Sequence, residues 1–188
     1  IRNGTYAESM LTSPSASSLL IIGESPDGVI LNITLVNGNA QVFKVSTTSN
    51  GKSYIKNIKF VGTSSDAGLT SIDAFAHSTV GATDLKFEDC KFEWSVSGKS
   101  VGNAFVMGTG NVNSFIACQF IIDRIDNAFF NGMTGGLVLN CKIAIAAAGS
   151  GVTLLPLAAN VSGAFFSGCT LNSLSATGVR INCNQFSF

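Results

Sequence analysis

Leu85-Lys86-Phe87-Glu88-Asp89-Cys90-Lys91-Phe92 carries the strongest structural signal in the chain. Apolar and charged side chains alternate up to Phe87, one extra residue follows, and the alternation resumes at Cys90. A period of two is typical of a β-strand with one buried face. The extra residue between Phe87 and Cys90 predicts a corner at which the chain changes face.

The same pattern recurs along the chain. Its anchor positions at Ile58, Cys90, Cys118, Cys141 and Cys169 are 32, 28, 23 and 28 residues apart. Such steps are compatible with one solenoid coil made of a few strands and variable turns. A last copy follows at Asn184 after only 15 residues, so we expect it to lie on another face. The expected core ladder consists of Phe87, Cys90, Phe115, Cys118, Val138, Cys141, Phe166, Cys169, Ile181 and Asn184.

A second element precedes the anchors in the form Asp73-Ala74-Phe75, Asn103-Ala104-Phe105 and Asn127-Ala128-Phe129. Two strand types in fixed order are what a solenoid gives, because each coil repeats the path of the coil before it. The sequence therefore predicts an all-β fold, a right-handed single-stranded parallel β-helix. We expect residues 1–188 to form one such domain, as part of a larger chain or assembly.

The cysteines at the anchor positions are expected to be buried thiols that act as small hydrophobic residues. Equivalent side chains in a ladder point the same way, which disfavours the geometry of a disulfide. The count of five is odd and no C-x-x-C motif occurs, so no zinc site is expected. We expect no metal and no cofactor.

The composition narrows the range of partners. Only 12% of the residues are charged and the formal net charge is zero, whereas soluble domains carry about 25% charged residues. Nucleic-acid binding would need a basic stripe, and membrane insertion would need about 18 consecutive apolar residues. Neither partner is expected. A surface poor in charge favours coverage by sister subunits, as a homo-oligomer, or by other chains of an assembly.

The opening segment resembles a known family. Gly4, Tyr6 and Glu8, followed by Gly23 and Val29-Ile30, are similar to the start of pectin methylesterases, which belong to the pectin-lyase-like β-helix superfamily. The resemblance implies the β-helix fold and an activity on polysaccharide. The catalytic signatures of that family have no counterpart here, so no active-site residue carries over. Phage tailspikes and other surface β-helices are similar at this level too.

Candidate chemistry is sparse. Asp123 and Asp126 flank Arg124 and are expected in a turn, since Asp favours turns. The alternative is that they line a groove for sugar cleavage, which uses two carboxyl groups. His77 is the single histidine and is expected in a loop. The charged side chains between Leu85 and Glu93 are expected to form a solvated outward ladder.

Aromatic side chains suggest contacts with a ligand or a partner chain. A flat ring can cover the apolar face of a sugar, and one ring of each Phe doublet must face outward on a strand. The candidates are Tyr54, Trp94, Phe130 and Phe165.

The hypothesis that best fits the sequence is a non-catalytic structural or binding domain of an extracellular or virion surface assembly. It would be of the tailspike, fibre or adhesin type, with polysaccharide as a candidate ligand. The alternative is a polysaccharide-processing enzyme of the esterase, lyase or hydrolase kind that uses Asp123, Arg124 and Asp126.

Overall fold

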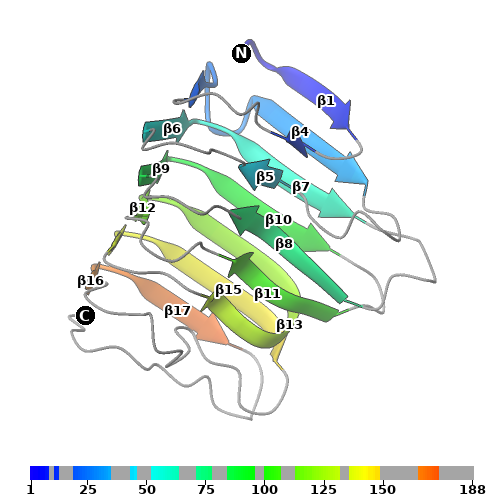
Figure 1. The fold of residues 1–188 in the computed structure, drawn as a ribbon, viewed down its shortest axis with the longest axis vertical. Coiled ribbons are helices and arrows are strands. Elements are labelled where there is room, and N and C mark those ends of the chain that lie inside the picture. The colour runs from blue at the N-terminus through cyan, green and yellow to red at the C-terminus, as the bar shows by residue number, and fades with distance from the viewer. Residues whose placement is uncertain are drawn as a thin grey trace.

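The structure is a computed structural model. It describes residues 1–8, 11–12, 19–34, 43–45, 52–63, 71–77, 84–95, 100–106, 113–131, 136–148 and 165–173. Within these ranges every regular element is a β-strand, and the paired strands are parallel (Figure 1). Successive passes of the chain lie side by side, which is consistent with an all-β parallel solenoid. None of the described elements is a helix that could cross a membrane.

The larger of two sheets contains eleven strands in the order β1-β4-β7-β10-β13-β11-β8-β5-β2, with β15 paired to β13 and β17 to β15. Its strands are β1 (Gly4–Glu8), β2 (Leu11–Thr12), β4 (Val29–Thr34), β5 (Phe43–Val45), β7 (Lys59–Thr63), β8 (Ser71–His77), β10 (Lys91–Ser95), β11 (Ser100–Val106), β13 (Gln119–Asn131), β15 (Lys142–Ala148) and β17 (Thr170–Ser173).

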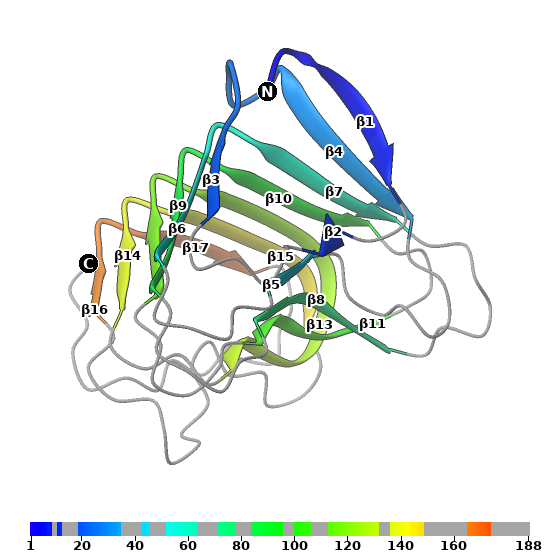
Figure 2. The same ribbon diagram turned by 45° about the horizontal axis from the view of Figure 1, so that its top comes forward.

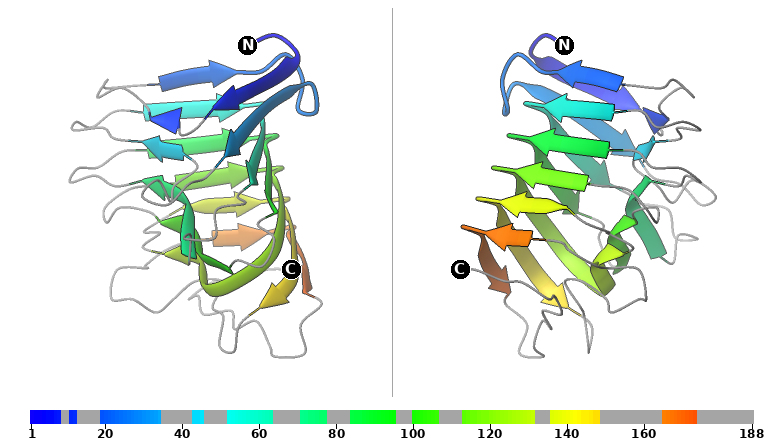
Figure 3. Two further views of the ribbon diagram at one scale, coloured as in Figure 1. Left: turned by 90° about the vertical axis from the view of Figure 1, so that its right-hand side faces the viewer. Right: turned by 60° about the vertical axis from the view of Figure 1, so that its left-hand side comes forward.

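The smaller sheet contains six strands in the order β16-β14-β12-β9-β6-β3. They point the same way and lie one above the other (Figure 3). They are β3 (Leu19–Ile22), β6 (Lys52–Lys56), β9 (Asp84–Glu88), β12 (Asn113–Ile116), β14 (Leu137–Leu139) and β16 (Phe165–Ser167).

The long strand β13 makes the larger sheet turn from one side of the stack to another (Figure 2). Its first part, Gln119 to Ile122, pairs with β10, whereas its second part, from Ile125 to Asn131, pairs with β11. The described strands therefore form three rows. The first is the small sheet, the second runs from β1 to β17, and the third runs from β2 to β11 and includes the end of β13.

A two-residue corner connects the first row to the second in five consecutive passes. The first residue of each corner has a positive φ angle near 55°, and its amide donates a hydrogen bond of 2.8–3.1 Å to the next pass in the four cases from Asn57 to Asn140. Left-handed backbone costs a residue with a Cβ atom roughly 1–2 kcal/mol, and Gly, Asn and Asp tolerate it best. The corner residues are Asn57 (57°), Asp89 (51°), Ala117 (53°), Asn140 (53°) and Gly168 (63°).

Phenylalanine stacks fill the interior between the rows. The ring of Phe92 lies parallel to those of Phe60 and Phe120, with centroids 5.2 and 5.1 Å apart, and Phe87 stacks on Phe115 at 5.3 Å. All five side chains are fully buried. Parallel strands in register, about 4.8 Å apart, bring equivalent rings into contact in this way.

The structure places the described residues of the expected core ladder as follows. Cys90, Cys118 and Cys141 are buried free thiols next to the corners, and Cys169 is a partly exposed free thiol. Ile181 and Asn184 lie outside the described residues. The extra residue in the sequence pattern belongs to the two-residue corner, and the remaining buried members are Phe87, Phe115, Val138 and Phe166.

One expected register is wrong by a residue. Phe75 pairs with Phe105, and Phe105 pairs with Phe130 rather than with Phe129. The register shifts between Val101 and Asn103, where the spacing of the strand partners changes. Phe43 pairs with Phe75 and extends the same row by one pass.

Candidate functional site

The outer face of the small sheet presents two columns of outward side chains, because alternate residues of each strand point away from the interior. Strand register brings residues from distant parts of the sequence next to one another. The first column is Leu20, Tyr54, Lys86, Ser114, Leu137 and Phe165, and the second is Ile22, Lys56, Glu88, Ile116, Leu139 and Ser167.

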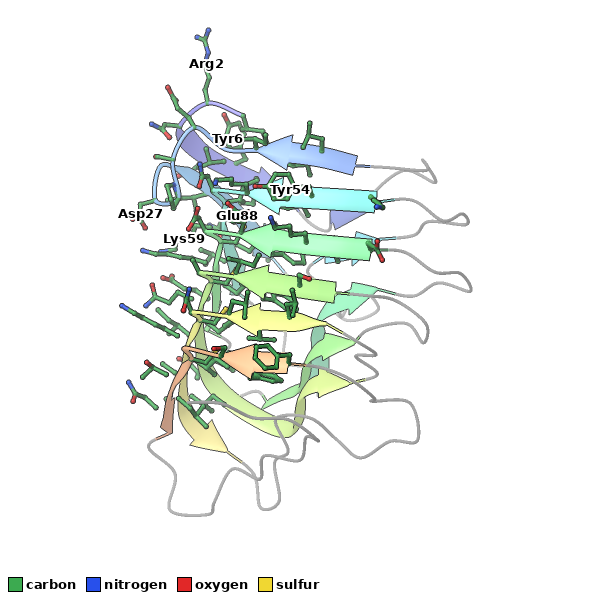
Figure 4. All side chains as sticks on the ribbon, turned by 90° about the vertical axis from the view of Figure 1, so that its left-hand side faces the viewer. Arg2, Tyr6, Asp27, Tyr54, Lys59 and Glu88 are labelled. Carbon is green, nitrogen blue, oxygen red and sulfur yellow. The ribbon has the colours of Figure 1, made fainter. Side chains whose placement is uncertain are left out.

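A polar cluster occupies the part of this face formed by β6 and β9. The Glu88 carboxylate accepts hydrogen bonds from Lys56 Nζ and Lys86 Nζ, both at 2.7 Å, and from the Tyr54 hydroxyl at 3.0 Å. Lys56 Nζ also lies 3.3 Å from the carboxylate of Asp89. We call Tyr54, Lys56, Lys86 and Glu88 the Glu88 cluster (Figure 4).

The Glu88 cluster holds its carboxyl group ionised. Hydrogen bonds from Lys56, Lys86 and Tyr54 lower the pKa of Glu88 to about 2. The hydrogen bond to Glu88 raises the pKa of Lys56 to about 12, and burial together with the Glu88 contact raises the pKa of Tyr54. General acid catalysis needs the opposite, a carboxyl group whose pKa is raised so that it holds a proton near neutral pH. Glu88 therefore suits an ion-pair network and not an acid catalyst.

A surface hollow of about 320 Å³ lies beside the ring of Tyr54. Ser53 lines it, and the buried Ser53 hydroxyl has no hydrogen-bond partner among the described residues. A ligand hydroxyl could supply that partner, since buried polar groups are usually paired. The Lys86 ammonium lies 5.0 Å from the centroid of the Tyr54 ring and covers part of it. The other lining residues are Lys52, Asp84, Leu85 and Ser114.

Apolar side chains are exposed on both sides of the Glu88 cluster. Leu20 and Ile22 on β3 are 69% and 46% exposed, and Leu137 on β14 is 41% exposed. Phe165 lies in register with Leu137 and is partly exposed. Single exposed apolar residues are common. On this face, exposed apolar side chains occur on β3 and also on the adjacent strands β14 and β16, so they are not isolated single residues.

A second hollow, of about 230 Å³, lies at the edge where the small sheet meets the larger one. It surrounds the corner residue Ala117, and we call it the corner hollow. Its lining combines ammonium, carboxylate and amide groups of successive passes: Pro26, Asp89, Cys90, Lys91, Ala117, Cys118, Gln119, Asn140 and Lys142.

The expected turn around Asp123 and Asp126 is wrong, because this segment belongs to the continuous strand β13. Asp123 is exposed. Positions three apart on an extended strand face opposite sides and lie about 10 Å apart along it. The strand partner also changes from β10 to β11 between them. The backbone therefore does not bring the two positions together, and Arg124, whose backbone pairs with Ala147, lies between them.

The candidate contact residues are spread over different faces. Tyr54 and Phe165 belong to the outer face of the small sheet, whereas Trp94 pairs with Gly62 and Ile122, both buried. Phe130 lies in the third row. The side chains of Trp94 and Phe130 lie outside the described ones, so their roles stay predictions. His77 ends strand β8 and is not in a loop.

Sequence reasoning placed Lys86 and Glu88 on an outward face but missed Lys56 and Ser53. A signal for Lys56 was present, because superposing the copy at Ile55-Ile58 on the copy at Phe87-Cys90 places Lys56 opposite Glu88. No sequence pattern marks Ser53, which occupies an inward position where the next pass has Leu85.

Comparisons with protein-family models, with curated proteins and with solved structures find no match to this chain. Among the described residues no group of three or more His, Cys, Asp or Glu side chains could hold a metal ion. Within the described residues, the two hollows, the Glu88 cluster and the exposed apolar side chains are the features that could bind a partner or a ligand.

Proposed function

We propose that this chain is a right-handed parallel β-helix of the pectin-lyase-like kind with a structural and binding role. It would belong to an extracellular or virion surface assembly of the tailspike, fibre or adhesin type. Sister subunits would bind to the outer face of the small sheet, and polysaccharide is the candidate ligand. No catalytic step is part of the proposal.

The fold supports the handedness and the resemblance. Connections between parallel strands of one sheet are right-handed in about 98% of cases. The residues shared with the pectin methylesterase opening also have packing roles. A Cβ atom on Gly23 would lie 2.0 Å from the carbonyl oxygen of Asn57, so only glycine fits directly after β3. These packing roles support the proposal that the first coils are built as in pectin methylesterases. They give no support for a shared catalytic activity.

The observation that carries the binding role is the exposed apolar surface on both sides of the Glu88 cluster. Leu20 and Ile22 on β3 are 69% and 46% exposed, and Leu137 on β14 is 41% exposed, with β6, β9 and β12 between the two strands. Exposed apolar side chains that recur on one face of a sheet favour association with another chain. Two copies of the chain could be related by a two-fold axis that runs along the direction in which the strands stack. Each strand of the small sheet would then face the same strand of the other copy, and the two strands would run in opposite directions. Lys86 of one copy would then face Glu88 of the other, and Leu137 would face Leu139.

The saccharide contact would use the hollow beside Tyr54. It offers an aromatic ring, an unpaired buried hydroxyl on Ser53 and several charged groups at its rim. Sugar sites combine such a ring with a few placed polar groups. The low pKa of Glu88 supports binding over acid-catalysed cleavage.

Self-association is tested by measuring the mass in solution for the unchanged chain and for Leu137→Lys. We expect a concentration-dependent oligomer that Leu137→Lys shifts to monomer, because a desolvated ammonium in an apolar contact costs several kcal/mol. Ile121→Lys is the matched control, since Ile121 is 37% exposed on the outer face of the other sheet. Light scattering or sedimentation from about 1 to 100 μM is the measurement. A stable monomer throughout, or equal dissociation by the control, contradicts the proposal.

A further inference from the structure

The corner hollow lies on a different edge from the Tyr54 hollow, and its size limits what could enter. About 230 Å³ is below the ~300–1,000 Å³ of pockets that enclose whole small molecules. It has room for one small group and not for an extended chain. The buried residues Cys90 and Cys118 form part of its lining.

Ala117 explains why a hollow exists at this corner. The corners before and after carry Asp89 and Asn140, which have longer side chains and also line the hollow, whereas Ala117 has only a methyl group. Ala117 also has a φ angle of 53°, a conformation that asparagine or glycine adopts at lower cost. A strained residue that leaves space at a polar site points to a use for that space.

Cationic and amide groups converge on the hollow from the second row. Lys91, Gln119 and Lys142 occupy one column of register, so their Cα atoms follow at roughly 4.8 Å steps. Lys91 pairs with Asp27, while Asp89 is within 3.3 Å of Lys56. The Lys142 side chain is exposed, and its ammonium has no ion-pair or hydrogen-bond partner among the described residues. The hollow therefore retains one available cation beside the Gln119 and Asn140 amides.

From this geometry we infer that the corner hollow is a subsite for an oxyanion, a carboxylate or a sulfate group. Lys142 supplies the charge, and the amide groups of Gln119 and Asn140 supply further donors. The anion can be free in solution or carried by a sugar. The inference does not depend on self-association or on the Tyr54 hollow.

Two substitutions at Ala117 separate the effect of filling the corner hollow from the effect of relieving the backbone strain. Ala117→Asn relieves the backbone strain and fills the hollow, whereas Ala117→Gly relieves the strain and leaves the hollow open. Both should raise the urea midpoint of unfolding, which shows that each variant folds. Only Ala117→Asn should lose the anion.

The measurement is the ¹⁵N amide shift of residues 117–119 and 140–142 in titrations at constant ionic strength with sodium chloride. The probes are sodium sulfate, sodium glucuronate and, as the neutral control, glucose. Lys142→Gln should weaken binding at least about tenfold, as expected for a charge-assisted contact. Ala117→Gly should retain the affinity of the unchanged chain within about twofold.

Saturation by sulfate alone would assign a free inorganic anion, and saturation by glucuronate would assign a sugar-borne carboxylate. Either result supports the subsite. The inference is overturned if neither anion saturates, if glucose gives the same shifts, or if Lys142→Gln and Ala117→Asn bind as tightly as the unchanged chain.

Discussion

Glu88 accepts hydrogen bonds from two lysines and a tyrosine on two adjacent strands. Lys56 is 32 residues away in sequence, and the parallel register places it directly opposite. The consequence is a carboxylate with a pKa of about 2 at the surface of the sheet. The alternating sequence pattern predicts only that Glu88 points outward. The low pKa of its carboxyl group also depends on residues of the neighbouring pass.

We predict that Glu88→Gln destabilises the fold near neutral pH and not in strong acid. The pKa of Glu88 is depressed from 4.5 to about 2, so its stabilisation is present above pH 4.5 and is lost as the pH falls through about 2. The expected cost at pH 7 is about 1 kcal/mol, because the partners are partly exposed.

Urea unfolding at pH 7, 4, 3 and 2 measures this difference. Glu93→Gln is the control, since Glu93 pairs with Lys59 at 2.8 Å in the second row, outside the cluster. A gap between Glu88→Gln and the unchanged chain that stays constant down to pH 2 would refute the assigned ionisation.

Among the elements, β7, β10 and β13 share one stack of rings. Phe92 has its ring between those of Phe60 and Phe120 and touches Phe87 edge-on, with centroids 5.3 Å apart. Each strand therefore depends on the strands on both sides for its interior contacts. The stack holds three passes of the chain in one register.

Phe92→Ala should lower the free energy of unfolding by about 3–5 kcal/mol, because it opens a cavity between two rings that cannot both move inward. Phe165→Ala is the comparison, since Phe165 is partly exposed on the small sheet and should cost much less. Chemical denaturation followed by circular dichroism measures both. Equal losses for the two variants would mean that the ring stack contributes no special stability.

The strands that follow the repeated pattern could be predicted from sequence, because alternation and a constant two-residue skip are local features. Phe87-Cys90 and Val138-Cys141 show this directly. The continuity of β13 could not be predicted, since Asp123 and Asp126 favour turns locally and only the pairing with β11 and β15 keeps the segment extended. The one-residue error at Phe129 has a similar cause, a register shift in the neighbouring strand.

The candidate sites were harder to predict than the strands. Tyr54 could be chosen as an aromatic with a polar group, but its contact with Glu88 depends on register. Neither hollow follows from a motif. The corner hollow exists because one corner carries alanine where others carry larger side chains, a difference that gains meaning only when the corners are aligned in space.

At the scale of the whole molecule, each pass contacts mainly the passes before and after it, so stability is close to a sum of neighbouring terms. Local opening is then expected to involve whole passes. The cysteine thiols at the corners can be used to detect such local opening, because they lie at equivalent places in successive passes.

We predict that Cys90 and Cys141 do not react with a thiol reagent in the native protein. Burial raises the pKa of Cys90 to about 12, and contact with neighbouring thiols and burial raise that of Cys141 to about 12, so little thiolate forms near neutral pH. Contact with Cys141 and burial raise the pKa of Cys169 as well, but its side chain is partly exposed, so it should react first among the described thiols because the reagent can reach it. Mass spectrometry after pulse labelling, with and without denaturant, measures the order. Labelling of Cys90 as fast as Cys169 would contradict a closed stack.

The five two-residue corners have a consequence for how such a chain can change length. The corner-to-corner distance in sequence varies from 32 to 23 residues between Asn57, Asp89, Ala117 and Asn140, yet the corners themselves stay identical in length. All variation is therefore absorbed elsewhere in each pass. The edge of the molecule formed by the corners therefore keeps the same structure in each of these passes. Insertions and grafted peptides belong away from it, because one added residue there would invert the side chains of the strand that follows.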